Sequence, residues 1–202
     1  AVSLLPRVVA GMGEPFADSS AIPTYLVSEV ARQSVTVALS GIGGDELFGG
    51  YPRYLGLRAG ARYAALPVAV RSWIASCAAS CLPDGSGGRD VRGRIKRFLL
   101  DGDRPLDEQY LRWTTFRPAG WDASLLAEEL RSAAVDSSAL HTIRNLFDRW
   151  PSLEPANRAM GVDLQTYLPD DLLRMGDRMS MVHSLELRVF FCDHHFLAFA
   201  CS

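Results

Sequence analysis

The order of apolar and polar residues predicts a chain that is mostly helical. Apolar positions recur at helical spacing over residues 18–31, where Asp18 or Ser19 is placed to cap the first turn. A short apolar run follows at residues 35–39, bounded by polar Ser34 and Ser40. Such a run is typical of a buried strand in a parallel sheet. Because a helix followed closely by such a strand is half of a doubly wound unit, we expect an α/β fold here.

Beyond residue 54 the periodicity is helical and strand signals fade. Turn-forming residues separate five predicted helices, over residues 67–82, 91–100, 106–116, 122–134 and 139–150. The sequence therefore predicts two parts, an α/β part over residues 1–54 and a mainly helical part over residues 55–202.

Composition narrows the classes of function. With 202 residues, 48% of them hydrophobic, the chain can bury one sizeable core. Its formal net charge of -2 gives no electrostatic reason to expect nucleic acid as a partner. The basic residues between Arg89 and Arg97 are more typical of a solvated helix face than of a phosphate site. No apolar run approaches the roughly 20 residues of a membrane span, and no basic leader opens the chain, so we expect a cytoplasmic protein.

The cysteines and paired histidines do not indicate a metal site. The four cysteines match no zinc-binding spacing, and we expect buried, reduced thiols that pack in the core: Cys77, Cys81, Cys192 and Cys201. His194 and His195 are neighbours, and neighbouring side chains on a helix point about 100° apart. We therefore expect a solvated or locally bonded histidine pair.

The strongest chemical signal follows the predicted strand. Residues 40–46 form a glycine-rich turn that ends in Asp45 and Glu46, and five glycines lie within residues 41–50. Backbone N–H groups of such a turn can cradle an anion, and ligands of α/β sheets bind beyond the carboxyl ends of strands. Carboxylates suit Mg²⁺, which also takes phosphate ligands, and a helix starting near Asp45 would add its positive end. The pattern favours a phosphate and magnesium site over a plain tight turn.

Three segments carry a family resemblance. Residues 40–54 resemble the second nucleotide-binding motif of asparagine synthetases, a Ser-Gly-x-Gly-x-Asp-Glu turn followed by Leu-Phe-Gly-Gly-Tyr. Residues 14–25 are similar to the block that precedes this motif in the bacterial enzymes. Residues 167–173, 177–181 and 183–189 resemble the late helical signature of the family. The three ordered motifs span nearly the whole chain.

The resemblance implies a fold and a reaction. It implies part of a PP-loop ATP pyrophosphatase fold, of the adenine nucleotide alpha hydrolase type, with residues 1–54 as its nucleotide-binding part. The implied reaction converts aspartate to asparagine through β-aspartyl-AMP, with ammonia from glutamine and release of AMP and pyrophosphate. ATP and Mg²⁺ are the implied cofactors. No catalytic residue is assigned.

The resemblance also implies roles for residues of the turn. Ser40 and Gly41 would contact ATP, Gly43 and Gly44 would let the backbone approach it, and Asp45 would be a magnesium ligand. Glu46 is a weaker candidate that could instead cap the following turn.

The sequence departs from the family pattern at several places. Ile42 stands where the family has an acid that is thought to assist the amine step, Phe190 replaces a proline, and Cys192 replaces a leucine. The first Ser-Gly-Gly-x-Asp-Ser signature, a lysine beyond the late signature and the glutaminase domain are missing from these residues. We therefore expect an internal fragment of a synthetase domain, whose full chain carries the glutaminase domain. A homodimer is a further expectation for the full chain.

Two alternatives stay open. The protein could instead be a related PP-loop amidotransferase that acts on another carboxylate, in a sugar, a peptide or a β-lactam precursor. Ile42 favours this interpretation. The segment could also be a non-catalytic remnant or a binding module, which the missing first signature favours.

Overall fold

The structure of the chain is a computed structural model that describes residues 2–81, 91–115, 127–129 and 139–200. It has two compact units: Ala1–Gly50 with Met160–Ser202, and Tyr51–Ala159. The first unit is therefore built from two stretches of chain that are far apart in the sequence. The division of the chain into functional parts at residue 54 stays a prediction.

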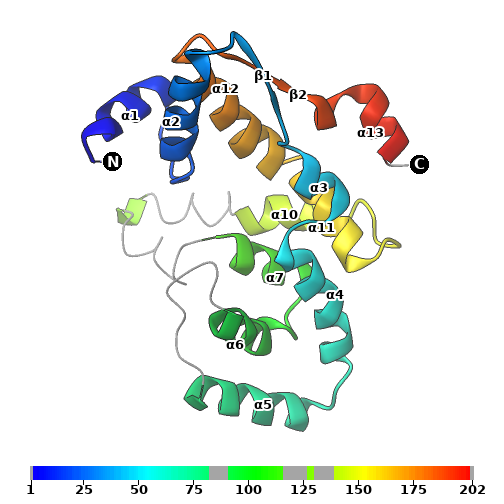
Figure 1. The fold of residues 1–202 in the computed structure, drawn as a ribbon. Coiled ribbons are helices and arrows are strands. Elements are labelled where there is room, and N and C mark those ends of the chain that lie inside the picture. Colours follow the sequence, from blue (N-terminus) through cyan, green and yellow to red (C-terminus); the bar gives the residue numbers. More distant parts are fainter. Residues whose placement is uncertain (1, 82–90, 116–126, 130–138, 201–202) are drawn as a thin grey trace. The chain divides into compact units, whose positions relative to one another are not determined.

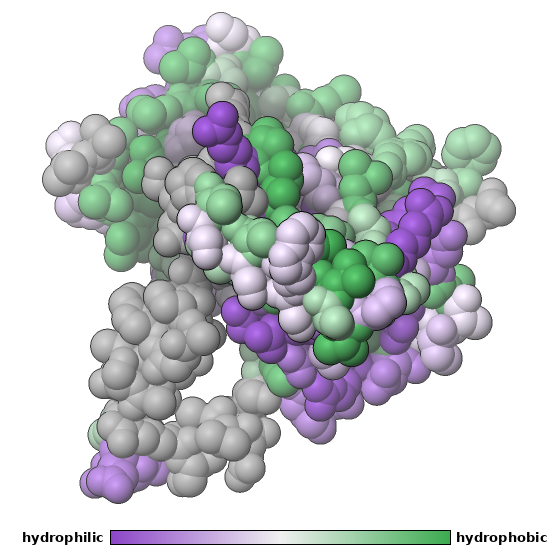
Figure 2. Space-filling model, turned by 90° about the horizontal axis from the view of Figure 1, so that it is seen from below, coloured by the Kyte–Doolittle hydropathy of each residue, from purple (hydrophilic) through white to green (hydrophobic). Residues whose placement is uncertain are grey.

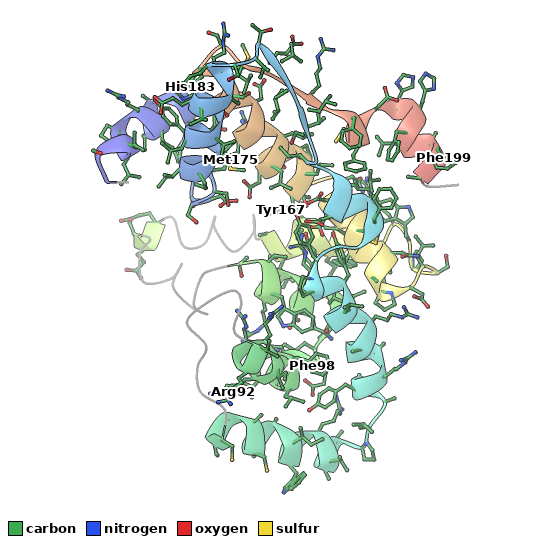
Figure 3. All side chains as sticks on the ribbon, in the orientation of Figure 1. Arg92, Phe98, Tyr167, Met175, His183 and Phe199 are labelled. Atoms are coloured by element: carbon green, nitrogen blue, oxygen red, sulfur yellow. The ribbon has the colours of Figure 1, made fainter. Side chains whose placement is uncertain are left out.

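Most of the first unit is helical. Its helical elements are η1 (Val2–Leu4), α1 (Leu5–Met12), α2 (Ala21–Arg32), α3 (Gly44–Phe48), the π-helical η2 (Leu168–Leu173), α12 (Arg174–Met181), η3 (Phe190–Cys192) and α13 (His194–Ala200). Helices α1, α2 and α12 pack around a common core whose buried residues are Val8, Met12, Ala21, Tyr25, Met175 and Met179. Met175 on α12 lies on the side of this helix that packs against α2 (Figure 3). Asp18 accepts a hydrogen bond from the backbone N–H of Ser20, the residue that precedes α2, but no side chain caps the helix, so the predicted cap at Asp18 or Ser19 is wrong.

Strands β1 (Val37–Ser40) and β2 (Glu186–Val189) lie side by side as a parallel pair (Figure 1). Val37 is opposite Glu186 and Ser40 is opposite Val189. The prediction of a parallel strand is confirmed, but its predicted burial is wrong, because Leu39 is 75% exposed. Among the residues that the structure describes, β2 is the only strand beside β1, so the apolar side chains of β1 meet little of the core.

The second strand was not predicted. Two of the four residues in β2 are charged, Glu186 and Arg188, and they alternate with Leu187 and Val189. Four residues are a weak strand signal on their own, and the partner that completes the pairing lies more than a hundred residues earlier in the chain.

The described part of the second unit is helical, as the periodicity predicts. Its helices are α4 (Pro52–Ala64), α5 (Val68–Cys81), α6 (Val91–Asp101), α7 (Leu106–Thr114), α10 (Ala139–Phe147) and α11 (Pro155–Asp163), the last of which contains the unit boundary. Four predicted helices are confirmed with shifted ends, whereas most of the predicted helix at residues 122–134 lies outside the described residues. Leu57, Tyr110 and Phe147 form part of the core, and the rings of Tyr110 and Phe147 meet edge to face at 5.4 Å.

Buried carboxylates of the second unit have guanidinium partners. Asp107 on α7 pairs with Arg144 on α10 at 2.6 Å, which links these two helices. Asp101 at the end of α6 pairs with Arg104 at 3.1 Å and with Arg112 at 2.8 Å. Because an unpaired buried charge is costly, these ion pairs make the burial of both carboxylates tolerable.

Two predicted core cysteines are exposed. Cys77 and Cys81 lie on exposed positions of α5, while Cys192 is partly buried and Cys201 lies outside the described residues. The expected burial of the first two is wrong because Ala78 alone of the α5 residues is fully buried. On the surface shown in Figure 2, apolar residues border hydrophilic ones. None of the described helices combines the length and apolar character that crossing a bilayer requires.

Phe147→Ala tests the core of the second unit. Phe147 is 1% exposed, whereas Phe199 on α13 is 77% exposed. We expect Phe147→Ala to lower the free energy of unfolding by about 3–5 kcal/mol through lost burial and a residual cavity. The matched Phe199→Ala should change it by about 0.5 kcal/mol or less. Urea unfolding followed by circular dichroism measures both, and similar losses for the two variants would contradict this account of the core.

Candidate functional site

The glycine-rich turn, residues 40–44, lies at the carboxyl end of β1. Ser40 ends the strand, and its side-chain oxygen accepts a hydrogen bond from the backbone N–H of Ile42 at 3.2 Å. The N–H of Gly44 donates to the carbonyl of Gly41 at 3.1 Å and closes the turn. Gly43 has φ +93°, a left-handed conformation that favours glycine. The chain thus passes from β1 through this turn directly into α3 (Figure 1).

Residues of the late segment pack directly against this turn. A Cβ atom on Gly43 would lie 3.0 Å from the sulfur of Cys192, and one on Gly44 would lie 3.1 Å from the ring of Phe191. Both glycines therefore provide room for protein side chains. A Cβ atom on Gly41, in contrast, would meet nothing within 4 Å, and this residue is exposed. The open face of the turn is thus at Gly41.

The two carboxylates after the turn have opposite surroundings. Asp45 is exposed on the first turn of α3, and its carboxylate lies against Gly50, whose missing side chain makes room for it. Glu46 is 1% exposed. Burial, and to a lesser degree the charge of Glu46, raises the pKa of the Cys192 thiol. Since successive residues of a helix point about 100° apart, only Asp45 of this pair is accessible to a ligand.

The described residues contain no group of three or more His, Cys, Asp or Glu side chains arranged to hold a metal ion. An ion at Asp45 would therefore share its ligand shell with a phosphate, which is a usual arrangement for Mg²⁺. The one-turn helix α3 is too short to contribute a large dipole.

An aromatic cluster supports the turn from the side of η3. The ring of Phe191 lies 5.8 Å from that of Phe48, 5.3 Å from that of Phe196 and 4.0 Å from that of Phe190. Phe191 was not among the predicted site residues, although the Phe190-Phe191 pair after β2 is an apolar signal in the sequence. His194, one of the histidine pair predicted to be solvated or locally bonded, has a side chain that is 81% exposed.

The block at residues 14–25 also meets the late segment. Glu14 pairs with Arg174, the first residue of α12, at 2.5 Å. Asp18 lies close enough to Asp171 for its charge to affect that carboxyl. Oδ1 of Asp171 is buried and has no hydrogen-bond partner, and burial, then the charge of Asp18, raises the pKa of Asp171 to about 6. Apart from residues 51–54, the three sequence motifs therefore lie within the first unit. The π-helical turn that carries Asp171 is a feature often found at functional sites.

Gly43→Ala tests the packing of the turn, with Gly13→Ala as its matched control. Both glycines have positive φ, but a Cβ atom on Gly13 would meet nothing within 4 Å. Alanine in this backbone region costs roughly 1–2 kcal/mol at either position. We expect Gly43→Ala to cost about 1 kcal/mol more, because its Cβ also meets Cys192. Urea unfolding measures the two losses. Equal losses, or no recovery when Cys192→Ala is added to Gly43→Ala, would contradict the packing.

Asp171→Asn tests the unpaired carboxyl. Because the folded-state pKa of about 6 lies above the ordinary value of 3.8, the folded state binds the proton more tightly than the unfolded state. The stabilisation by this group is complete below pH 3.8 and is lost as the pH rises through about 6. We expect the thermal midpoint of Asp171→Asn to exceed that of the unmodified protein by a margin that grows from pH 4 to pH 7. Thermal unfolding across this range measures the margin, and a constant margin would contradict the prediction. Asp170→Asn, which removes an exposed neighbouring carboxylate, is the control.

Comparisons with known proteins agree with the resemblance. Residues 1–202 match the family described as asparagine synthase. The chain is 33% identical over 189 residues to the glutamine-hydrolysing asparagine synthetase 1 of Bacillus subtilis, covering 94% of this chain and 28% of that protein. It is 33% identical over 202 residues to a putative glutamine-hydrolysing asparagine synthetase of Mycobacterium tuberculosis, covering 98% of this chain and 29% of that protein.

A putative asparagine synthetase 2 of Methanocaldococcus jannaschii is 67% identical over 42 residues, which cover 21% of this chain and 8% of that protein. No solved structure matches the chain. The chain spans 28% and 29% of the lengths of the Bacillus and Mycobacterium relatives, and almost all of it aligns with them. The chain belongs to the asparagine synthase family.

Proposed function

We propose that the intact protein is an ATP-dependent amide-forming ligase that converts aspartate to asparagine with ammonia derived from glutamine. Membership of the asparagine synthase family supports ATP-dependent amide ligation in general. The observation that carries the proposal is the accessible turn at Gly41, followed by the exposed carboxylate of Asp45, at the carboxyl end of a parallel strand. This is the place where α/β sheets bind their ligands. We further propose a PP-loop fold for the complete domain.

Ser40 and Gly41 are proposed to contact ATP. The hydroxyl oxygen of Ser40 accepts the Ile42 N–H, so its own proton stays available for donation to a phosphate oxygen. Backbone N–H groups of the turn, with Gly43 and Gly44 shaping it, would orient the phosphates for reaction. Asp45 fits a magnesium ion that shares its ligands with ATP, and the ion would offset negative charge on the leaving pyrophosphate.

The proposed reaction has two steps. A side-chain carboxylate oxygen of aspartate forms a bond to the α-phosphorus of ATP while the bond to pyrophosphate breaks, which gives β-aspartyl-AMP. The nitrogen of ammonia then attacks the acyl carbon, AMP leaves, and the nitrogen loses a proton. Holding the two reactants together can contribute about 7–11 kcal/mol to lowering the barrier.

Ile42 favours one alternative substrate class. An isoleucine cannot accept the proton that leaves the attacking nitrogen, and such general-base assistance is worth about 10²–10⁴ in rate. Its side chain instead packs next to Gly176 on α12. A related amidotransferase that acts on a sugar, peptide or β-lactam precursor is therefore the second candidate.

The remaining parts of the proposal concern the longer protein. The chain covers 28% of the Bacillus relative, which is named as a glutamine-hydrolysing enzyme. On this basis we propose a glutaminase domain for the intact protein. A homodimer and a cytoplasmic location are proposed from the sequence analysis alone.

Asp45→Asn tests the proposed role of this carboxylate. With ATP, Mg²⁺, aspartate and glutamine, the intact protein should release AMP and pyrophosphate. We expect Asp45→Asn to lower kcat/KM by on the order of 10²-fold, because a ligand for the ion is lost. Asp148→Asn, which changes an exposed carboxylate of the second unit, should keep full activity. Chromatographic assay of AMP measures the rates, and equal activity of both variants would contradict the assignment of Asp45.

The same assay separates the candidate functions. AMP release with another carboxylate, but not with aspartate, would favour the related amidotransferase. Failure to release AMP with every carboxylate tested would overturn the ligase proposal and favour a non-catalytic remnant.

A further inference from the structure

The absence of a side chain at Gly176 leaves a notch in the surface of α12, and the side chain of Ile42 reaches this notch. The residue is buried on α12, and a Cβ atom placed on it would lie 2.9 Å from Cδ1 of Ile42. The same atom would lie 3.3 Å from Cδ2 of Leu187 on β2. Both distances are shorter than an ordinary van der Waals contact between carbon atoms, about 3.5–4.0 Å. The end of the Ile42 side chain therefore occupies space that any larger residue at position 176 would take.

Ile42 is the main side-chain anchor of the turn. Between Ser40 and Asp45 it is flanked only by glycines, which have no side chains to hold the backbone in place. Its backbone N–H donates to the side chain of Ser40, and its Cδ1 atom lies at the notch that Gly176 leaves in α12. From the other side, Phe191 and Cys192 limit how far the turn can move. Where the Ile42 side chain cannot rotate to clear a group added at position 176, its displacement moves the backbone N–H groups next to it.

We propose that Gly176 is a positioning residue for the turn: the absence of its side chain sets how deeply Ile42 packs, and this depth aligns the turn for an anionic ligand. The effect on nucleotide affinity rests on the proposed function, since it requires that residues 40–44 bind ATP. The coupling between the two residues is a property of the fold and does not depend on any ligand. A purely structural role for Gly176 would change stability alone.

A swap of one methyl group tests the pair. Gly176→Ala adds a methyl group at the notch, and adding Ile42→Val removes Cδ1, the atom that it meets first. The double variant therefore conserves volume, which cores tolerate far better than an added group. Gly11→Ala is the matched control, because its Cβ would lie 2.6 Å from Val182 and 3.2 Å from Met179 of α12 without meeting a residue of the turn.

The first readout is the Kd for ATP of the intact protein, measured by isothermal titration calorimetry. We expect Gly176→Ala to weaken ATP binding about fivefold or more, because the added methyl group pushes against Ile42 and displaces the turn. The double variant should return to within about twofold of the unmodified protein. Gly11→Ala should lower the thermal midpoint and leave the Kd for ATP unchanged.

The second readout is amide hydrogen exchange at Ile42 and Gly44, whose N–H groups are hydrogen-bonded within the turn. Gly176→Ala should speed exchange at both, the double variant should restore the original rates, and Gly11→Ala should leave them unchanged. Unchanged exchange in Gly176→Ala, or no restoration in the double variant, would overturn the inference. If the unmodified protein does not bind ATP, the proposed function fails, and the exchange rates still decide whether Gly176 positions the turn.

Discussion

The parallel pairing of β1 with β2 is the interaction on which the candidate site depends. It sets residues 186–189 beside residues 37–40, and so brings the ends of both strands to the same edge. The segments that precede and follow β2 then contact the turn, through Gly176 on α12 and through Phe191 and Cys192 on η3. A pair of four-residue strands is weak alone. Its stability comes from the packing of α1, α2 and α12, so the core and the site are stabilised together.

Asp171 in the first unit lacks the kind of partner that two buried carboxylates of the second unit have. In the second unit, the buried Asp101 and Asp107 each have a guanidinium partner. In the first unit, Oδ1 of Asp171 is buried without a hydrogen-bond partner, and Asp18 adds a like charge. Burial and the like charge disfavour the ionised form of this carboxyl group. Groups whose pKa is shifted in this way are common at functional sites. The contrast agrees with placing the chemistry in the first unit, where the glycine-rich turn and Asp45 also lie.

The glycines of the site serve different physical purposes. Gly41 leaves a face of the turn open, whereas Gly43 and Gly44 make room for Cys192 and Phe191. Gly176 makes room for Ile42. Glycine-rich turns are usually explained by the approach of a ligand, yet most of these positions are explained by protein packing. The replacements at Phe190 and Cys192, which depart from the family pattern, lie in the same packed segment as Phe191 and are part of this arrangement.

The sequence alone was sufficient for the helical character, a parallel strand before the turn, and the family. These features rest on local spacing or on motifs that lie within short segments, so periodicity and residue type predict them. The second strand, the exposure of Cys77 and Cys81, and the opposite burial of Asp45 and Glu46 were decided by tertiary structure. Each depends on which distant segment packs against a residue, as Gly176 packs against Ile42. The residues next to it in the sequence do not indicate which segment that is.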